Sequence, residues 1–306
     1  ILLGTSLEVN TRSNSQTLQA TELADGTSVG VYIYHNGTIT SASTSYGYKN
    51  LAYTAGNATG DLTLVTATDQ PYFPQDKTKT IDIYAFAPRT GVYTSTAELS
   101  TLTAENAFTT TADQTTDANY RASDFVWGMA AAVTYATAST SSITIPLKHK
   151  LSKVNINIAP GTGMTLTKLT NARIKLNGVI LDGTVNFTTG AVTTSGTTTS
   201  SVILTSSAST SATTTFTSGT TNYTACTSSA VIIPQTIAAS TSFITVELWD
   251  GTAYTTAYNV KTTATTTFDA EKVYTYNIIV NSQGLSLTTT IADWTSAGSA
   301  INGTAE

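Results

Sequence analysis

Alternation of apolar and polar residues with a period of two constrains this chain more than any other feature of its sequence. In Thr80–Ala87, positions 81, 83, 85 and 87 form one apolar face, while Tyr84 and Phe86 lie on the other. This segment is therefore predicted to be a strand that is buried on both sides. Val154–Ile158 and Tyr274–Val280 repeat the alternation. The pattern is typical of β-strands, because successive side chains of a strand point to opposite faces of the sheet.

Turn signals separate the alternating segments. Asn or Asp followed by Gly reaches positive φ at low cost, so such pairs favour tight hairpins. These pairs are Asn36-Gly37, Asn177-Gly178, Asp182-Gly183 and Asp250-Gly251. The clearest predicted hairpin joins Val246–Trp249 to Thr252–Tyr254. Only Leu18–Leu23 and Ser95–Ala107 have a spacing that fits short helices or turns, and Thr193–Thr215 is expected to be a long exposed excursion. The sequence therefore predicts an all-β fold.

The composition fits strands with polar outer faces. Only 11% of the 306 residues are charged, and the net charge is −5. Disordered chains lack aromatic residues and carry a high net charge, whereas this chain has 15 Tyr, 8 Phe and 3 Trp. Its 14 Lys and Arg residues are scattered singly, which argues against nucleic-acid binding. No apolar stretch approaches the roughly 20 residues that a membrane-spanning helix needs.

The length suggests two domains, because single cores rarely grow beyond about 250–300 residues. A weak internal repeat, in which an aromatic or aliphatic pair followed by Pro-Gln precedes a predicted strand, supports two similar halves. Its two copies are Tyr72–Gln75 before Ile81–Phe86 and Ile232–Gln235 before Phe243–Trp249. We expect a boundary near residue 148, with an N-terminal β-sandwich domain of residues 1–148 and a C-terminal one of residues 149–306.

No set of side chains has the spacing of an active site. His149 lies between Lys148 and Lys150 on a predicted strand, where packing or hydrogen bonding is expected rather than metal binding. Cys226 is the single cysteine and is expected to be a buried thiol. We therefore predict no catalytic, cofactor-binding or metal-binding residues, and no cofactor. A glycan-processing enzyme stays open as a remote third possibility, because a glycosidase needs only two carboxylates that folding brings together.

Several segments resemble, in the same order, the pattern of the fimbrillin family, the Bacteroidales-type subunits also called type V pilins. These segments are Val29–Tyr34 ("IGVY"), Tyr72–Pro74 with Ile81–Pro88 ("YFP … VDFYAYYP"), Asp124–Trp127 with Ile145–Val154 ("DLLWA … L-F-H-x-LSK"), and Phe268–Tyr276 with Ile291–Trp294 ("F-x-A-G-x-x-Y-x-Y … I-x-x-W"). One departure is Glu271, which stands where that pattern has Gly and suggests a changed turn.

The resemblance implies two tandem transthyretin-like β-sandwich domains. It also implies a lipoprotein precursor that is exported to the cell outer membrane and trimmed by an Arg-specific protease. Loss of the first strand would leave a groove that the C-terminal strand of the next subunit fills. An added strand would satisfy the unpaired backbone groups and cover the apolar surface that such a groove exposes. The partners implied are further copies of the chain, minor fimbrial subunits, and host or bacterial surface ligands.

Two segments are candidates for these roles. Arg12 follows a possible first strand and precedes a polar loop, so it is the candidate protease-processing site, although a solvated turn residue and earlier trimming before Ile1 remain open. The candidate donor strand lies at the C-terminus, where an ordinary closing strand would have the same pattern. Its candidate residues are Leu285, Leu287, Ile291, Trp294 and Ile301.

The leading hypothesis is a structural subunit of a surface fimbria or pilus that polymerises by strand exchange and supports adhesion. The alternative is a fibre-tip adhesin or a monomeric surface lipoprotein of the same fold, which binds a host or glycan ligand. That alternative predicts an aromatic-lined concave site and no free C-terminal strand.

Overall fold

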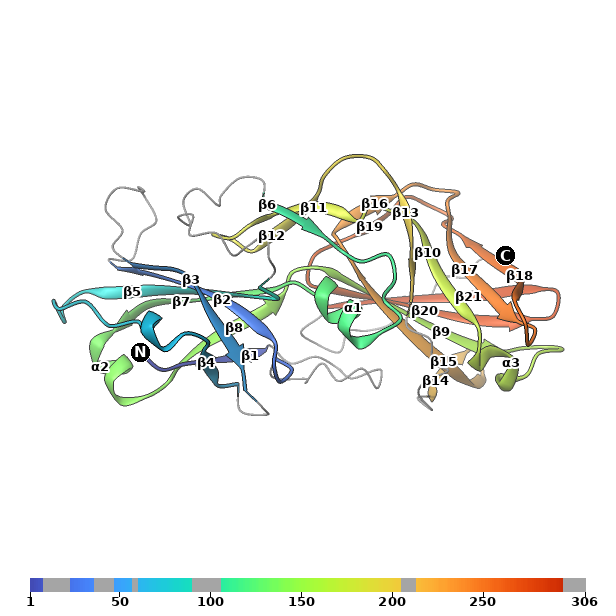
Figure 1. Cartoon of the computed structure of the whole chain (residues 1–306). Coiled ribbons are helices and arrows are strands. Elements are labelled where there is room, and N and C mark those ends of the chain that lie inside the picture. The colour runs from blue at the N-terminus through green and yellow to red at the C-terminus, as the bar shows by residue number, and fades with distance from the viewer. Residues whose placement is uncertain (8–22, 36–46, 57–59, 90–105, 205–212, 294–306) are drawn as a thin grey trace.

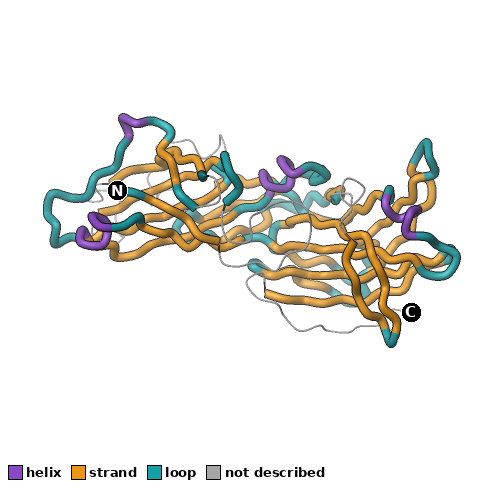
Figure 2. The backbone as a smooth tube through the Cα atoms, turned by 90° about the horizontal axis from the view of Figure 1, so that it is seen from below, coloured by secondary structure: helices purple, strands orange, loops and turns teal. Residues whose placement is uncertain are grey.

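The structure of the chain is a computed structural model, which describes residues 1–7, 23–35, 47–56, 60–89, 106–204 and 213–293. The described residues form an elongated molecule, with the first strands at one end and the last strands at the other (Figure 1). Nearly all of the regular structure is strand, and the helices are short (Figure 2). The predicted all-β fold is confirmed.

A seven-stranded sheet forms the first half of the molecule. Its strands are β1 (Leu3–Leu7), β2 (Ser28–His35), β3 (Gly47–Ala55), β4 (Leu62–Leu64), β5 (Thr80–Ala87), β7 (Val126–Thr134) and β8 (Ile143–His149). Their order is β1-β8-β7-β5-β2-β3-β4, and only β1 with β8 is a parallel pair. As predicted, β5 is buried on both faces: Ile81 and Ile83 contribute to one core cluster, and Tyr84 and Phe86 to another.

Two sheets enclose the core of the second half. The five-stranded sheet has the order β14 (Thr213–Ser218), β15 (Thr221–Ile232), β9 (Ser152–Pro160), β20 (Lys272–Asn281) and β21 (Gly284–Asp293). The four-stranded sheet has the order β13 (Ser200–Ile203), β10 (Arg173–Val179), β17 (Ser242–Trp249) and β18 (Tyr254–Lys261). Ile156 on β9, Leu176 on β10 and Ile278 on β20 are fully buried in the shared core. A two-stranded sheet of β16 (Gln235–Ile237) and β19 (Thr266–Phe268) completes this half.

A three-stranded sheet joins the two halves. It has the order β12 (Ala191–Thr194), β11 (Asp182–Asn186) and β6 (Asn106–Thr109), so it takes one strand from before residue 148 and two from after it. Phe108 and Val185 of this sheet share a buried cluster with Tyr84 and Phe86 of β5. The main chain leaves the seven-stranded sheet after β8 and enters the five-stranded sheet at β9. A division into two sandwich domains at residue 148 stays a prediction.

In the described parts of the chain, three short α-helices and one 3₁₀ turn connect the strands. They are α1 (Asp117–Ser123), α2 (Tyr135–Thr140), α3 (Leu166–Thr170) and η1 (Ala67–Asp69). The sequence pattern did not indicate α1 and α2, because each rests on a local capping bond: Thr116 accepts from the Asn119 N–H, and Thr134 accepts from the Thr137 N–H. No helix in the described ranges is long and apolar enough to cross a membrane.

Four local expectations are wrong at residues that the structure describes. Asn177-Gly178 lies inside β10 and Asp182-Gly183 inside β11, not in hairpin turns. The helix or turn expected over Ser95–Ala107 ends in a strand, since residues 106 and 107 belong to β6, which pairs with β11. The expected exposed excursion over Thr193–Thr215 contains β13, and Val202 and Leu204 are buried in the second core. In the last two cases pairing with a distant strand overrides a weak local pattern. Residues 18–22, 95–105 and 205–212 lie outside the described residues.

Candidate assembly strands and polar surface

The first strand fills a slot in the seven-stranded sheet. On one side, β1 pairs with β8, with Leu3 opposite Ile143 and Thr5 opposite Ile145. On the other side, the Thr5 N–H donates to the Gly60 carbonyl at 2.6 Å. Leu3 is 3% exposed and packs in the same cluster as Ile143 and Ile145. Removal of β1 would therefore uncover both backbone hydrogen-bonding groups and apolar side chains along one groove.

The last described strand lies at a sheet edge. β21 pairs with β20 over its whole length, from Lys272 opposite Asp293 to Asn281 opposite Gly284. In the sheet order it has a neighbouring strand on one side only, among the described residues. Leu285 and Leu287 pack against the core of the second half, whereas Ile291 is 36% exposed. These three candidate donor residues therefore lie on a strand that is already paired within its own sheet.

The remaining candidate residues cannot be located. β1 ends at Leu7, and Arg12, the candidate processing site, lies outside the described residues. Trp294 and Ile301 of the candidate donor segment also lie outside them. The structure thus brings together the first three donor candidates on one strand and leaves the others as predictions.

A buried polar pair lies where β8 meets the segment that follows α1. The His149 Nδ1 atom lies 2.8 Å from the Asp124 Oδ1 atom, and both side chains are less than 5% exposed. This confirms the prediction that His149 serves packing and hydrogen bonding. The Asp124 Oδ2 atom is buried without a hydrogen-bond partner. Burial lowers the pKa of Lys153, and the negative charge of Asp124 offsets part of that shift.

The pocket beside this pair is small. It is lined by Arg121, Asp124 and His149 together with apolar side chains, and its volume is about 20 Å³. Such a cavity holds about one water molecule and no organic substrate. Cys226 is buried, as expected for a structural thiol. Among the described residues no group of three or more His, Cys, Asp and Glu side chains could hold a metal ion.

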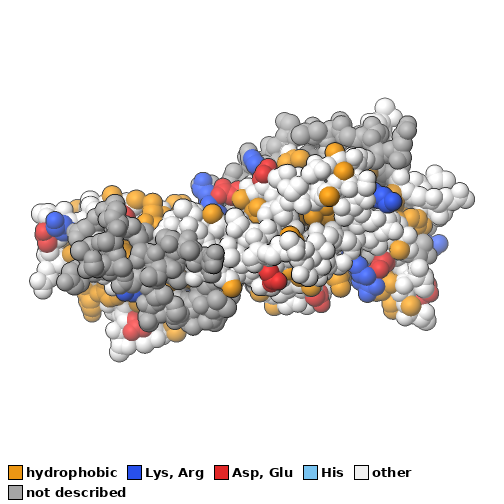
Figure 3. All heavy atoms as spheres, turned by 90° about the horizontal axis from the view of Figure 1, so that it is seen from above, with side chains coloured by type: hydrophobic (Ala, Val, Ile, Leu, Met, Phe, Trp, Pro, Cys, Tyr) orange, Lys and Arg blue, Asp and Glu red, His pale blue; other side chains and the backbone are white. Residues whose placement is uncertain are grey.

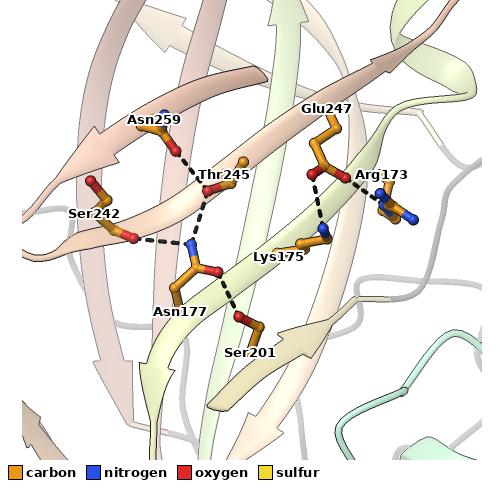
Figure 4. Close-up of polar contacts among 8 residues, drawn as sticks. All are labelled: Arg173, Lys175, Asn177, Ser201, Ser242, Thr245, Glu247 and Asn259. Atoms are coloured by element: carbon orange, nitrogen blue, oxygen red, sulfur yellow. Dashed lines mark hydrogen bonds and ion pairs between the residues drawn. The ribbon is translucent and has the colours of Figure 1, made fainter. Parts of the chain in front are cut away.

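The outer face of the four-stranded sheet carries a network of charged side chains (Figure 4). Glu247 of β17 accepts a hydrogen bond from the Arg173 Nε at 2.5 Å and another from the Lys175 Nζ at 2.8 Å. Burial raises the pKa of Glu247, but the hydrogen bonds and positive charges of Lys175 and Arg173 lower it more, so it lies below its ordinary value. The carboxylate is thus held ionised and in a fixed orientation.

Uncharged polar side chains continue the network along the same face (Figure 4). Asn177 donates to the Ser242 carbonyl at 3.0 Å and to the Thr245 hydroxyl at 2.9 Å, and it accepts from the Ser201 hydroxyl at 2.8 Å. The Thr245 hydroxyl donates to the Asn259 Oδ1 at 2.7 Å. No sequence motif marks this face, although the alternation of polar with buried aliphatic residues on β10 indicates that one side of the strand faces solvent.

A family model described as "Fimbrillin-like" matches residues 11–294. The chain belongs to the fimbrillin-like family. This family consists of fimbrial subunits, which are generally non-enzymatic and act at the cell surface. Among curated proteins, none matches the sequence.

Solved structures show the same fold as this fimbrillin-like chain. One, from Bacteroides uniformis, is named for a proposed role in cell adhesion; it is 19% identical, the alignment covers 96% of this chain and 97% of that one, and the TM-score is 0.63. Another, from Bacteroides ovatus, has the same description, with 17% identity, coverage of 97% and 100%, and a TM-score of 0.62. At these identities the likeness shows the fold alone.

One departure from the fimbrillin pattern is explained by the structure. Glu271 has φ +62°, in the left-handed region that a glycine adopts without strain. Its N–H donates to the Leu151 carbonyl at 3.0 Å, and its carboxylate accepts from the Lys150 Nζ at 2.5 Å. Glutamate thus adopts the left-handed conformation here, and an ion pair to Lys150, the residue that follows β8, accompanies it.

Proposed function

We propose that this fimbrillin-like chain is a structural subunit that polymerises by strand exchange at the bacterial surface and supports adhesion there. The observation that carries the proposal is the position of β1 in a slot between β8 and the segment before β4. A terminal strand that is held between two neighbours can be replaced by a strand from another molecule without rearrangement of the rest of the sheet.

The vacated slot is well suited to an incoming strand. Departure of β1 would leave the edge of β8 unpaired and expose part of the cluster that contains Ile143 and Ile145. Each apolar side chain buried by a replacement strand contributes about 1.5–3 kcal/mol before ordering costs. About five such side chains would make a long-lived joint between subunits.

The C-terminal segment from Leu285 is the proposed donor. Because β21 is paired with β20 and closes its own sheet, we place the donor in the part of the segment beyond Asp293. Residues 295–301 contain no charge and no proline, the features that sheet edges use to prevent pairing. Further copies of the chain are the main proposed partners, and minor fimbrial subunits are additional ones.

Truncation after Asp293 tests the donor role. The shortened chain retains β21 and is expected to fold as a monomer with cooperative unfolding, yet to form no fibres by negative-stain electron microscopy. The matched control removes only residues 303–306, which lie beyond the last candidate donor residue, and should assemble normally. Fibres of normal length from the chain that ends at Asp293 would show that the donor strand lies elsewhere.

Proteolytic release of the first strand is the proposed trigger for assembly. We propose that the chain is exported as a lipoprotein precursor and cleaved after Arg12, which frees β1. Assembled material should then begin at Ser13, and Arg12→Gln should block fibre formation while Arg89→Gln should not. N-terminal sequencing of assembled fibres that returned Ile1 would exclude cleavage at Arg12.

A second candidate function is that of a fibre-tip adhesin or a monomeric surface lipoprotein. The exposed aromatic pair of Trp249 and Tyr254 beside a polar sheet face favours it, because paired exposed aromatic rings are typical of binding surfaces. Electron microscopy of the processed protein separates the candidates: a shaft subunit forms long fibres, and an adhesin or lipoprotein forms monodisperse particles.

A further inference from the structure

The outer face of the four-stranded sheet combines two features. One is the row of polar side chains in Figure 4, whose members are fixed by hydrogen bonds to each other and to the backbone. The other is an exposed pair of aromatic rings at the end of the same face. Trp249 and Tyr254 are 39% and 37% exposed, and their ring centroids lie 5.0 Å apart at the turn between β17 and β18.

The aromatic end and the polar row are continuous. The Arg173 guanidinium lies 4.1 Å from the centroid of the Tyr254 ring, and the same side chain binds Glu247. Trp249 lies two residues beyond Glu247 on β17, so both project from the same side of the strand. From Trp249 to Thr245, β17 runs for about 14 Å at roughly 3.4 Å per residue.

The charges on this face argue against a nucleic acid and against a lipid surface. Arg173, Lys175 and Lys261 supply three positive charges, and Glu247 and the turn residue Asp250 two negative charges, which leaves one positive charge on a chain whose net charge is −5. On the view in Figure 3, positive and negative side chains are scattered singly or in small mixed groups. Binding to phosphates requires a concentration of Lys and Arg that this face lacks.

The polarity argues against a protein partner and favours a carbohydrate. The buried centre of a protein interface is apolar, and here two aromatic rings are bordered by amides, hydroxyls and charges. A sugar ring has the complementary composition. Its C–H groups carry a small positive charge and pack against the negative face of an aromatic ring, while its hydroxyl groups both donate and accept hydrogen bonds.

We propose that the outer face of β10, β17 and β18 is a glycan-binding site. A sugar ring packs against Trp249, next to the Tyr254 ring that Arg173 holds in position. The hydroxyl groups of that ring and the next one bind the Glu247 carboxylate and the Arg173 and Lys175 donors, which form stronger hydrogen bonds than neutral groups do.

The chain of sugars then continues toward the amide end of the face. Asn259 is exposed there, and its Oδ1 accepts from Thr245, so the donor side of its amide is the side offered to a sugar hydroxyl in this proposal. Because Glu247 and Asn177 are already fixed by their neighbours, little side-chain freedom is lost when a sugar binds. The inference deepens the second candidate function and does not require polymerisation.

Isothermal titration calorimetry of the chain of residues 1–306 tests the proposal. The probes are hexasaccharides of β-1,4-linked glucose and of β-1,4-linked N-acetylglucosamine, and oligosaccharides released from mucin. At least one probe is expected to bind, and Trp249→Ala should weaken that binding about tenfold or more, the usual effect of removing a central aromatic contact. Binding of none of the three, or equal binding by Trp249→Ala, would overturn the proposal.

Two control variants separate a local effect from a general one. Tyr223→Ala removes the partner of Phe216 from another cross-strand aromatic pair, with centroids 5.6 Å apart, and Tyr72→Ala removes a lone tyrosine that is 68% exposed. Both should bind the probe as the parent chain does. If either control loses as much affinity as Trp249→Ala, the sugar binds aromatic residues in general and the proposed site is wrong.

A further variant covers the case in which Trp249→Ala disturbs the hairpin. Asn259→Ala changes an exposed side chain away from the turn, and it should weaken binding severalfold without altering thermal unfolding. Unchanged binding by a folded Asn259→Ala would limit the site to the aromatic end and contradict the extended face. Fibre formation, measured on the same samples, is expected to be unaffected by these variants, so failure of glycan binding and failure of polymerisation are distinguishable.

Discussion

The Trp127 indole Nε1 donates a hydrogen bond to the Phe187 carbonyl at 2.8 Å, and this bond ties the seven-stranded sheet to the hairpin of β11 and β12. The Phe187 ring packs 4.5 Å from the Phe86 ring, centroid to centroid. The two halves of the molecule are thus joined by an aromatic cluster rather than by a solvated linker. A large apolar contact of this kind opposes relative motion of the halves.

Gly190 is predicted to be required for this junction. It has φ +72°, and a Cβ at this position would lie 2.6 Å from the Trp127 ring. Gly196 has a similar φ of +79° but open space around it. Both substitutions by Ala carry the strain of a left-handed residue, about 1–2 kcal/mol, and Gly190→Ala adds about 1–3 kcal/mol of overpacking. Urea unfolding should show the larger loss for Gly190→Ala; equal losses would mean that the Trp127 ring moves freely.

Gln114 is predicted to contribute strongly to the stability of the fold through its side-chain amide. Its fully buried amide donates to the Val231 carbonyl at 2.9 Å and accepts from the Val231 N–H at 2.9 Å, so it extends the sheet as a backbone would. Gln114→Met leaves two buried backbone groups unpaired, at about 1–3 kcal/mol each. The exposed control, Gln283→Met, should change the free energy of unfolding by less than about 0.5 kcal/mol. Similar stabilities of the two variants would show that water replaces the amide.

Two variants of Glu271 separate the energetic effect of its left-handed backbone from that of its ion pair with Lys150. Glu271→Ala keeps the left-handed backbone and loses the bond to Lys150, so it should be destabilising. Glu271→Gly also loses that bond but removes the strain, partly offset by the greater freedom of an unfolded glycine. The Gly variant is therefore expected to be about 1 kcal/mol more stable than the Ala variant in chemical denaturation. The opposite order would mean that the turn is not left-handed in solution.

Acidification is predicted to reduce the contribution of Glu247 on the polar face to the free energy of unfolding. The pKa of Glu247 is lower in the folded chain than its ordinary value of 4.5, because the bonds from Lys175 and Arg173 outweigh the effect of burial. A carboxyl group of this kind stabilises the fold above pH 4.5, and its contribution is lost as the pH falls through the folded pKa. Between pH 5 and pH 3 the free energy of unfolding should therefore fall less for Glu247→Gln than for the parent chain. The difference between the two falls should be about the contribution of this one group.

Lys175→Gln is the companion variant for this pH dependence. It removes one of the two cationic partners of Glu247 and should give a pH dependence between those of the parent chain and Glu247→Gln. Thermal unfolding across the pH range measures all three. Parallel curves for the parent chain and Glu247→Gln would show that this carboxylate does not titrate with folding.

The sequence by itself determined the strands that follow local rules. The alternation in Thr80–Ala87 gave β5 and both of its buried faces, and Asp250-Gly251 gave the turn between β17 and β18. The ordered segments that resemble fimbrillins indicated the family that the sequence comparison shows. These features succeed because side-chain period and turn conformation are properties of neighbouring residues.

Only the tertiary structure decided which distant segments meet. The parallel pairing of Leu3 with Ile143, the joining of β6 to β11, and the use of Gln114 as a partner for Val231 have no local signature. The cost of closing a long loop rises slowly with its length, so many partners compete at similar cost and packing selects among them. The candidate glycan face has the same origin. The alternation of polar and apolar residues on β10 is visible in the sequence. Only the pairing of β10 with β17 places Arg173 beside Glu247 and over the exposed Tyr254 ring at the hairpin turn.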